Sequence, residues 1–180
     1  MIKLRKFEET DIARLLGWIQ DARFLLQWAG RQYEYPLNRT QLLKSIDRTR
    51  SNRPAHFMFT ACRQTDGTAV GHIELMSIDY GNGAARLGRV LIGQPEDRGS
   101  GLGVAMVAEA LHYAFNTLGL TEVKLGVFAC NQPAIECFKK SGFTEYEFRE
   151  SVQQFENESW NLVMMKFSRH EFMEHAYGMQ

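Results

Sequence analysis

The chain has 180 residues, of which 44% are hydrophobic, and its 21 basic and 21 acidic residues give a formal net charge of zero. This length and apolar content suit a single domain over residues 1–180 with a sizeable core. Without an excess or clustering of Lys and Arg, no nucleic-acid partner is expected. No apolar run is long enough to cross a bilayer, and the first residues lack the apolar centre of a signal peptide, so we expect no membrane partner and a cytoplasmic location.

The N-terminal half alternates between short helix and strand signals. Residues 2–7 alternate in polarity and predict a strand, and apolar positions three and four apart predict a helix that begins at Thr10. A short helix with a loop is expected over 21–37, and another helix over 40–49. Residues 56–62 and 69–77 predict a hairpin, because Thr65-Asp66-Gly67 between them is a turn signal.

The C-terminal half continues with a strand at 84–92, a glycine loop, a long helix and a strand at 123–129. A short helix and two strands, near 144–151 and 160–167, follow. The tail from 168 to 180 is partly amphipathic and could pack on its own domain or on a second copy, so a homodimer is one expectation. This order predicts a single α/β (α+β) domain with a mixed, mostly antiparallel central sheet flanked by helices.

The most informative segment is Arg98-Gly99-Ser100-Gly101-Leu102-Gly103, between an apolar strand and an amphipathic helix. A helix start of this kind has unpaired N–H donors and the positive end of the helix dipole, which suit a pyrophosphate. Val104 and Ala105 follow the last glycine, so the Lys and Ser or Thr of a P-loop are absent. The third glycine of the dinucleotide fingerprint is absent as well, since Val104 occupies its place.

A second block, from Asn131 to Phe143, lies after the strand at 123–129. Asn131 suits a helix N-cap, Pro133 the first turn and Gly142 the left-handed position after the last turn. Together, the Arg-x-x-Gly-x-Gly pattern and this Asn-x-x-Ala block resemble the GNAT family of acetyl-CoA-dependent N-acyltransferases. The resemblance is most secure over residues 71–167.

The resemblance implies acetyl-CoA as co-substrate, no metal, and a set of cofactor-binding residues. The strand end would offer backbone groups to the pantetheine arm, the glycine loop would hold the pyrophosphate, and two residues of the second block would lie beside the arm and the thioester. In chain order these are Leu91, Ile92, Gly93, Arg98, Gly99, Ser100, Gly101, Leu102, Gly103, Asn131 and Phe138. The alternatives are that the Leu91 and Ile92 side chains are core and that Arg98 is a solvated surface charge.

Amine acetylation needs a base, because a primary amine with a pKa near ~10.4 must lose a proton before it attacks a thioester. The resemblance implies a carboxylate on a central strand near the thioester, and Glu74, which shares one strand face with His72 and Met76, is the candidate catalytic base. Its alternative role is that of an exposed or salt-bridged strand residue, and His72 is expected to be structural. Phe138 occupies a position where many relatives have a Tyr acid, so water or direct release of the thiolate is expected instead.

Acceptor recognition is expected from the aromatic segment after the first helix. Trp28 and Tyr33 are the candidate substrate-binding residues, and ordinary core packing is the alternative for each. The acceptor would be an amine of a small molecule or a protein. Two functions remain: an active N-acetyltransferase that works by direct attack in a ternary complex, and a catalytically weak or inactive acyl-CoA-binding module. A binder of another pyrophosphate ligand, such as a nucleotide, is a third and weaker hypothesis.

Overall fold

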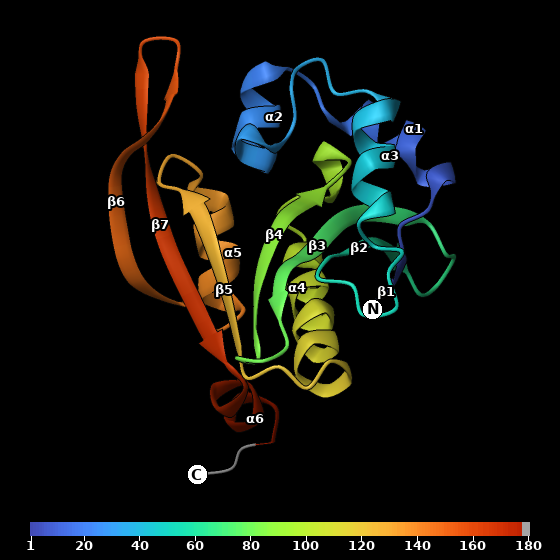
Figure 1. Ribbon diagram of the computed structural model, residues 1–180, viewed down its shortest axis with the longest axis vertical. Helices are drawn as coiled ribbons and strands as arrows, with labels where there is room; N and C mark the ends of the chain where they lie inside the picture. Colours follow the sequence, from blue (N-terminus) through green and yellow to red (C-terminus); the bar gives the residue numbers. More distant parts are fainter. Residues whose placement is uncertain (178–180) are drawn as a thin grey trace.

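The computed structural model describes residues 1–177, and its centre is one seven-stranded sheet with the strand order β1-β2-β3-β4-β5-β7-β6 (Figure 1). Neighbouring strands are antiparallel, except that β4 and β5 are parallel. This confirms the predicted mixed, mostly antiparallel sheet. The strands are β1 (Ile2–Lys6), β2 (Phe57–Arg63), β3 (Ala69–Asp79), β4 (Ala84–Ile92), β5 (Glu122–Phe128), β6 (Thr144–Phe155) and β7 (Glu158–Ser168).

Helices lie on both faces of this sheet. The α-helices are α1 (Ile12–Trp18), α2 (Ala22–Ala29), α3 (Arg39–Asp47), α4 (Leu102–His112), α5 (Gln132–Lys140) and α6 (Arg169–Tyr177). Short 3₁₀ turns are η1 (Glu9–Asp11), η2 (Gly30–Gln32) and η3 (Pro95–Asp97), and a π-helical segment, η4 (Tyr113–Thr117), extends α4. Within residues 1–177, no helix combines the length and the apolar character that a membrane crossing requires.

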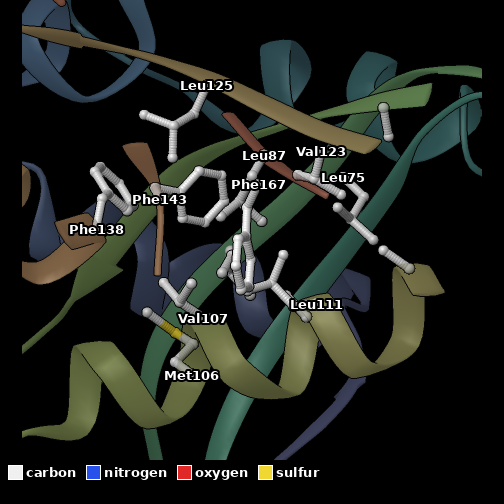
Figure 2. Packing of buried hydrophobic residues seen from close by; sticks show 14 of the residues in the cluster. Leu75, Leu87, Met106, Val107, Leu111, Val123, Leu125, Phe138, Phe143 and Phe167 are labelled. Atoms are coloured by element: carbon white, nitrogen blue, oxygen red, sulfur yellow. The ribbon is translucent and has the colours of Figure 1, made fainter. Parts of the chain in front are cut away.

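Two hydrophobic clusters hold these layers together. The larger joins the sheet to α4 and α5, and its members include Leu75, Leu87, Val107 and Phe167 (Figure 2). The smaller joins the other face to α1, α2 and α3 and includes Met58 and Leu91. In α6, Phe172 contacts the larger cluster through Phe115, with ring centroids 5.3 Å apart. Of the predicted tail, residues 178–180 and the side chain of Tyr177 lie outside the described part.

A bulge in β4 sets the geometry of the functional region. His72 of β3 pairs with Leu91 and Glu74 pairs with Gly88, so β4 has one extra residue between the two pairs. Arg89 lies in this bulge and has a positive φ of 50°. An extra residue exchanges the two faces of a strand. Leu87 therefore belongs to the larger cluster, whereas Leu91 belongs to the smaller one.

β4 and β5 separate just before the bulge. Their parallel pairing covers only three residue pairs and ends where Arg86 meets Lys124. The rest of each strand continues without a partner on that side, so the sheet opens toward the C-terminal end of β4. The β6–β7 hairpin is longer than the sequence predicted. Its β7 end contacts α2, because Arg23 forms two hydrogen bonds of 2.7 and 2.8 Å with Glu158.

Candidate active site

A cavity of about 720 Å³ lies where β4 and β5 separate. The second half of β4 and the end of β5 form its sides, the start of α4 and one face of α5 close one end, and α2 covers the other through Phe24, Gln27 and Trp28. A group that enters at the glycine loop can therefore extend along β4 to α2 without leaving the cavity. Such a shape suits a long molecule with a phosphate end and a reactive end.

The glycine loop is shaped by backbone conformation. Gly99 and Gly101 have φ values of 75° and 87°, in the left-handed region that side chains disfavour. Gly101 is the N-cap of α4, and no side chain in the described chain caps that helix start. A Cβ at Gly103 would lie 3.1 Å from Cys137 Sγ, so glycine there lets α4 approach α5. Free N–H groups in such a glycine turn suit an anion such as a phosphate.

Eight of the eleven predicted cofactor residues line the cavity: Leu91, Ile92, Arg98, Gly99, Gly101, Gly103, Asn131 and Phe138. The other three, Gly93, Ser100 and Leu102, do not line it. A Cβ at Gly93 would collide with Trp18, which explains the glycine by packing. Ser100 Oγ donates to the Asp97 carbonyl at 2.5 Å, and Leu102 packs against the larger cluster.

Arg98 connects the glycine loop to the end of β4. Its guanidinium donates to the carbonyls of Ile92 and Gly93, both at 3.3 Å, and lies 5.9 Å from the Phe24 ring centroid. These contacts hold the loop beside the cavity, so the side chain is more than a solvated surface charge. Its charge stays at the cavity wall, within reach of an anion bound there.

In α5, Asn131 is the predicted N-cap, because its Oδ1 accepts a hydrogen bond from the Ala134 amide at 3.3 Å. Phe138 is 6% exposed and contacts Phe143 edge-on, with ring centroids 6.0 Å apart. Neither ring has a polar group that could donate a proton. Burial raises the pKa of the neighbouring Cys137 thiol, which also lines the cavity. Cys137 is therefore a protonated thiol at neutral pH, without the thiolate of a catalytic cysteine.

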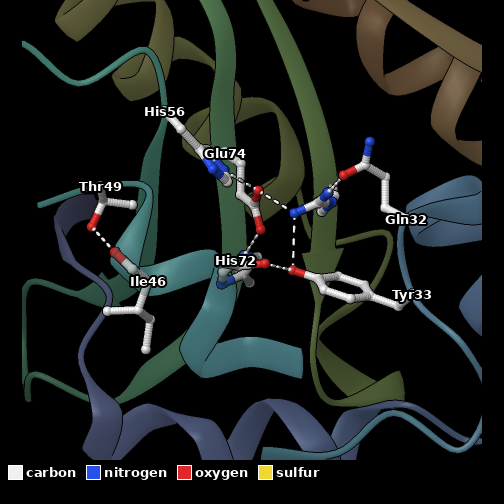
Figure 3. Close-up of polar contacts among 9 residues, drawn as sticks. Gln32, Tyr33, Ile46, Thr49, His56, His72 and Glu74 are labelled. Carbon is white, nitrogen blue, oxygen red and sulfur yellow. Dashed lines mark hydrogen bonds and ion pairs between the residues drawn. The ribbon is translucent and has the colours of Figure 1, made fainter. Parts of the chain in front are cut away.

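Glu74 of β3 lies in a buried polar network that includes His56, His72 and Tyr33 (Figure 3). The residue is 0% exposed. Three groups donate to its carboxylate: His56 Nε2 at 2.5 Å, His72 Nε2 at 2.8 Å and Arg89 Nη1 at 2.7 Å. Glu74 does not line the cavity, whereas Arg89 does.

These contacts determine the charge of Glu74. Burial by itself would raise the pKa of Glu74, but the Arg89 charge and the hydrogen bonds from His56 and His72 outweigh burial and hold that pKa well below its usual range. The geometry therefore disfavours direct proton transfer to this carboxylate, because an anion with three donors is a weak base. The salt-bridged role that the sequence left open for Glu74 describes its surroundings better.

The network continues from Arg89 to the acceptor side. Arg89 donates to the Tyr33 hydroxyl at 3.0 Å and to Gln32 Oε1 at 2.8 Å, and the Tyr33 hydroxyl shares a 2.8 Å hydrogen bond with Ser45 Oγ. Of the two predicted acceptor residues, Trp28 lines the cavity and Tyr33 does not. Tyr33 instead stacks behind Trp28, with ring centroids 6.1 Å apart. Burial and the Glu74 charge raise the pKa of Tyr33, so its hydroxyl stays protonated.

Sequence reasoning missed Arg89 and the role of His56. The sequence did contain a signal for Arg89. Arg89 is two residues from both Leu87 and Leu91, so simple strand alternation makes it one of the buried positions of β4. A cation in such a position needs a buried anion, and the neighbouring strand offers Glu74. Within the described residues, no group of three or more His, Cys, Asp or Glu side chains is arranged to hold a metal ion.

Comparisons with known proteins show what the chain is similar to. The acetyltransferase (GNAT) domain family matches residues 2–144. Spermidine N(1)-acetyltransferase of Escherichia coli K12 is 27% identical over 143 residues, covering 79% of this chain and 73% of that protein. Human alpha/beta-tubulin-N-acetyltransferase 9 is 34% identical over 76 residues, covering 42% and 37%. The structure of spermidine N-acetyltransferase from Vibrio cholerae with CoA and spermine has the same fold, with a TM-score of 0.82, 20% identity and coverage of 96% and 98%.

Proposed function

Since the chain belongs to the GNAT family and is an acetyltransferase that uses acetyl-CoA, we propose that it acetylates a primary amine of a small molecule by direct attack within a ternary complex. One observation carries the proposal: a single cavity joins the glycine loop to the aromatic wall of α2. The pyrophosphate would bind at Gly99, Gly101 and Gly103. The pantetheine arm would follow β4 toward Trp28.

The chemistry follows from this arrangement. The free amine attacks the thioester carbonyl carbon, a C–N bond forms, and the C–S bond breaks as the thiolate leaves with its electron pair. We propose that a backbone N–H near the end of β4, where no strand pairs on the β5 side, stabilises the oxyanion. Because Phe138 has no hydroxyl, the thiolate leaves with water or without an acid. A thiol pKa near ~8.5 makes it a good leaving group.

A polyamine is the first acceptor to test, because the spermidine N(1)-acetyltransferase of Escherichia coli is among the relatives. The α2 wall supports a cationic amine through the faces of Phe24 and Trp28. Charge gives less support: among the described lining residues Glu136 is the one carboxylate, whereas Arg89, Arg98 and Lys140 are basic. We therefore infer that an ammonium group is held by aromatic faces more than by ion pairs.

Release of CoA thiol should be followed with acetyl-CoA and a panel of amines: spermidine, an aromatic monoamine and a peptide with a free N-terminus. We expect turnover with a small amine and none with the peptide. In parallel, thermal unfolding is measured with acetyl-CoA, CoA and ATP, because a ligand at ~100 times its Kd stabilises the folded state by about 2.7 kcal/mol.

The outcomes separate the hypotheses. Stabilisation by acetyl-CoA without turnover of any amine would indicate the acyl-CoA-binding module. Faster turnover of the peptide would make the acceptor a protein amine. Equal stabilisation by ATP would indicate a general pyrophosphate site and would contradict the proposal.

A further inference from the structure

The two histidines that share the Glu74 carboxylate have a defined tautomer. His56 and His72 each bond to it through Nε2, at 2.5 and 2.8 Å. An ionised carboxylate only accepts hydrogen bonds, so each Nε2 carries a hydrogen. In a neutral ring the other nitrogen, Nδ1, then holds a free lone pair. The carboxylate thus fixes which nitrogen of each ring can accept a proton.

His72 differs from His56 in what surrounds Nδ1. The His72 ring is 1% exposed, and its Nδ1 is a buried atom for which the described residues offer no hydrogen-bond partner. The same holds for Nε1 of Trp28, whose ring meets His72 edge-on with centroids 5.7 Å apart. An unsatisfied acceptor and an unsatisfied donor thus lie on neighbouring rings, and buried polar atoms of this kind are normally satisfied by a water or a ligand atom.

His72 does not line the cavity, but the Trp28 ring that it meets does, on the α2 wall where the acceptor amine would bind. His56, in contrast, shares the carboxylate but has no ring contact with Trp28 among the residues described. Other titratable or charged groups around His72 come from several elements: Glu74 from β3, Arg89 from β4, Tyr33 after α2, and Asp11, which accepts from Thr60 opposite His72 on β2 at 3.0 Å. Phe7 packs edge-on against the ring at 4.9 Å.

We propose that His72 Nδ1 accepts the proton of the acceptor ammonium, directly or through one water beside Trp28 Nε1, while Glu74 is a positioning residue that holds the imidazole. This inference rests on the proposed acetyl transfer and changes the identity of the base. The ammonium gives one proton to His72 and attacks as a free amine. Its second proton neutralises the departing thiolate, so the products are the amide, the CoA thiol and a protonated His72 that releases its proton to solvent.

A matched pair of variants tests the proposal: His72→Gln and His56→Gln. Gln retains an Nε2–H₂ donor for Glu74 but has no Nδ1 acceptor. For His72→Gln we expect kcat with the best amine of the panel to fall ~100-fold or more, as for loss of a general base, while the Kd for acetyl-CoA stays within about twofold. For His56→Gln, kcat should fall less than about tenfold.

The pH profile separates a catalytic role from a structural one. In His72→Gln the residual rate should rise more steeply with pH than the wild-type rate, toward the pKa of the amine itself near ~10.4, because without a base only amine that is already free reacts. A folded His72→Gln variant with unchanged kcat would overturn the inference alone. No turnover by the wild type would overturn both this inference and the proposed function.

Trp28→Phe provides a second test if His72→Gln does not fold. This change removes the Nε1–H and keeps an aromatic ring against Tyr33 and His72. We expect a lower kcat, by about tenfold, because the bridging atom loses one of its two partners. An unchanged kcat in Trp28→Phe, with an altered KM for the amine only, would show that the site between the rings has no part in proton transfer.

Discussion

The two ends of the cavity are built in different ways. At the cofactor end, the shape comes from backbone: glycines with positive φ and the uncapped start of α4. At the acceptor end, it comes from buried side chains, since Arg89 joins Glu74 and Tyr33, which lie 15 and 56 positions away in the chain. A backbone device depends on a short motif, whereas a side-chain network depends on the whole fold. The two ends should therefore respond differently to substitution.

The largest effect on ligand binding is expected from Gly101→Glu at the cofactor end. The new carboxylate would enter the anion site, so we expect the stabilisation by acetyl-CoA, about 2.7 kcal/mol at 100 times its Kd, to disappear. Gly67→Glu in the β2–β3 turn is the matched control, because both glycines have positive φ, 87° and 74°, and a Cβ at either meets open space. Thermal unfolding with and without acetyl-CoA provides the measurement. Equal binding by the two variants would contradict the anion site.

At the acceptor end, the corresponding change is Arg89→Met. It leaves the Glu74 carboxylate buried without its cation, and loss of one partner of a buried ion pair costs about 3–5 kcal/mol. Urea unfolding should show this loss, and the double variant Glu74→Gln/Arg89→Met should recover part of it. Arg98→Met at the cofactor end should change the free energy of unfolding by less than about 1 kcal/mol. Similar losses in Arg89→Met and Arg98→Met would erase the contrast between the two ends.

Acid should destabilise the fold through the buried carboxylates Asp11 and Glu74, because both have lowered pKa values. Burial raises the pKa of Asp11, but hydrogen bonds from Arg5, the Glu8 amide and Thr60 outweigh burial and lower that pKa to about 2. A folded pKa below the unfolded value of about 4 contributes stability that is complete above about pH 5 and is lost as the pH falls toward 2. Glu74 acts in the same direction, with its loss extending to still lower pH.

Urea unfolding at pH 7, 5, 4 and 3 measures this dependence. The free energy of unfolding should decline less steeply in Asp11→Asn than in the wild type, although the variant is less stable at pH 7. Glu145→Gln, which removes an exposed ion pair with Lys139 of 3.0 Å, should keep the wild-type slope. A wild-type slope in Asp11→Asn would show that Asp11 titrates alike in the folded and unfolded states.

The difference between the two ends also explains what the sequence could predict. The glycine loop, the Asn131 cap and the order of strands depend on neighbours along the chain, so local patterns predicted them correctly. Strand alternation likewise placed Glu74 and His72 on one face, and the two side chains are hydrogen-bonded to each other. Local signals therefore located the elements and the glycine loop.

Burial parity signals that Arg89 needs a buried anion, but the geometry of the network could not be predicted in this way. Arg89 reaches Glu74 because a bulge in β4 exchanges the strand's faces, and nothing in the alternation of residues 84–92 marks that extra residue. Tyr33 was expected at the acceptor, but it packs behind Trp28 because its hydroxyl finds Ser45 and Arg89. Pairings between distant segments decide both outcomes. The sequence left the role of Glu74 undecided because its ion-pair partner, Arg89, had not been identified.

The smallest effect is expected from Phe138→Tyr, which tests whether the cofactor end contributes chemistry beyond its backbone. Phe138 is 6% exposed and lines the cavity, so the variant restores a hydroxyl at the position where the family often has one. If the thiolate leaves unaided, kcat should stay within about threefold, because a thiol with a pKa near ~8.5 needs little help at neutral pH. General acid catalysis by the new hydroxyl would raise kcat by ~100-fold or more. An increase of that size would show that a side chain can contribute chemistry at the cofactor end too. The contrast between the two ends would then hold for how their shapes are built, but not for their chemistry.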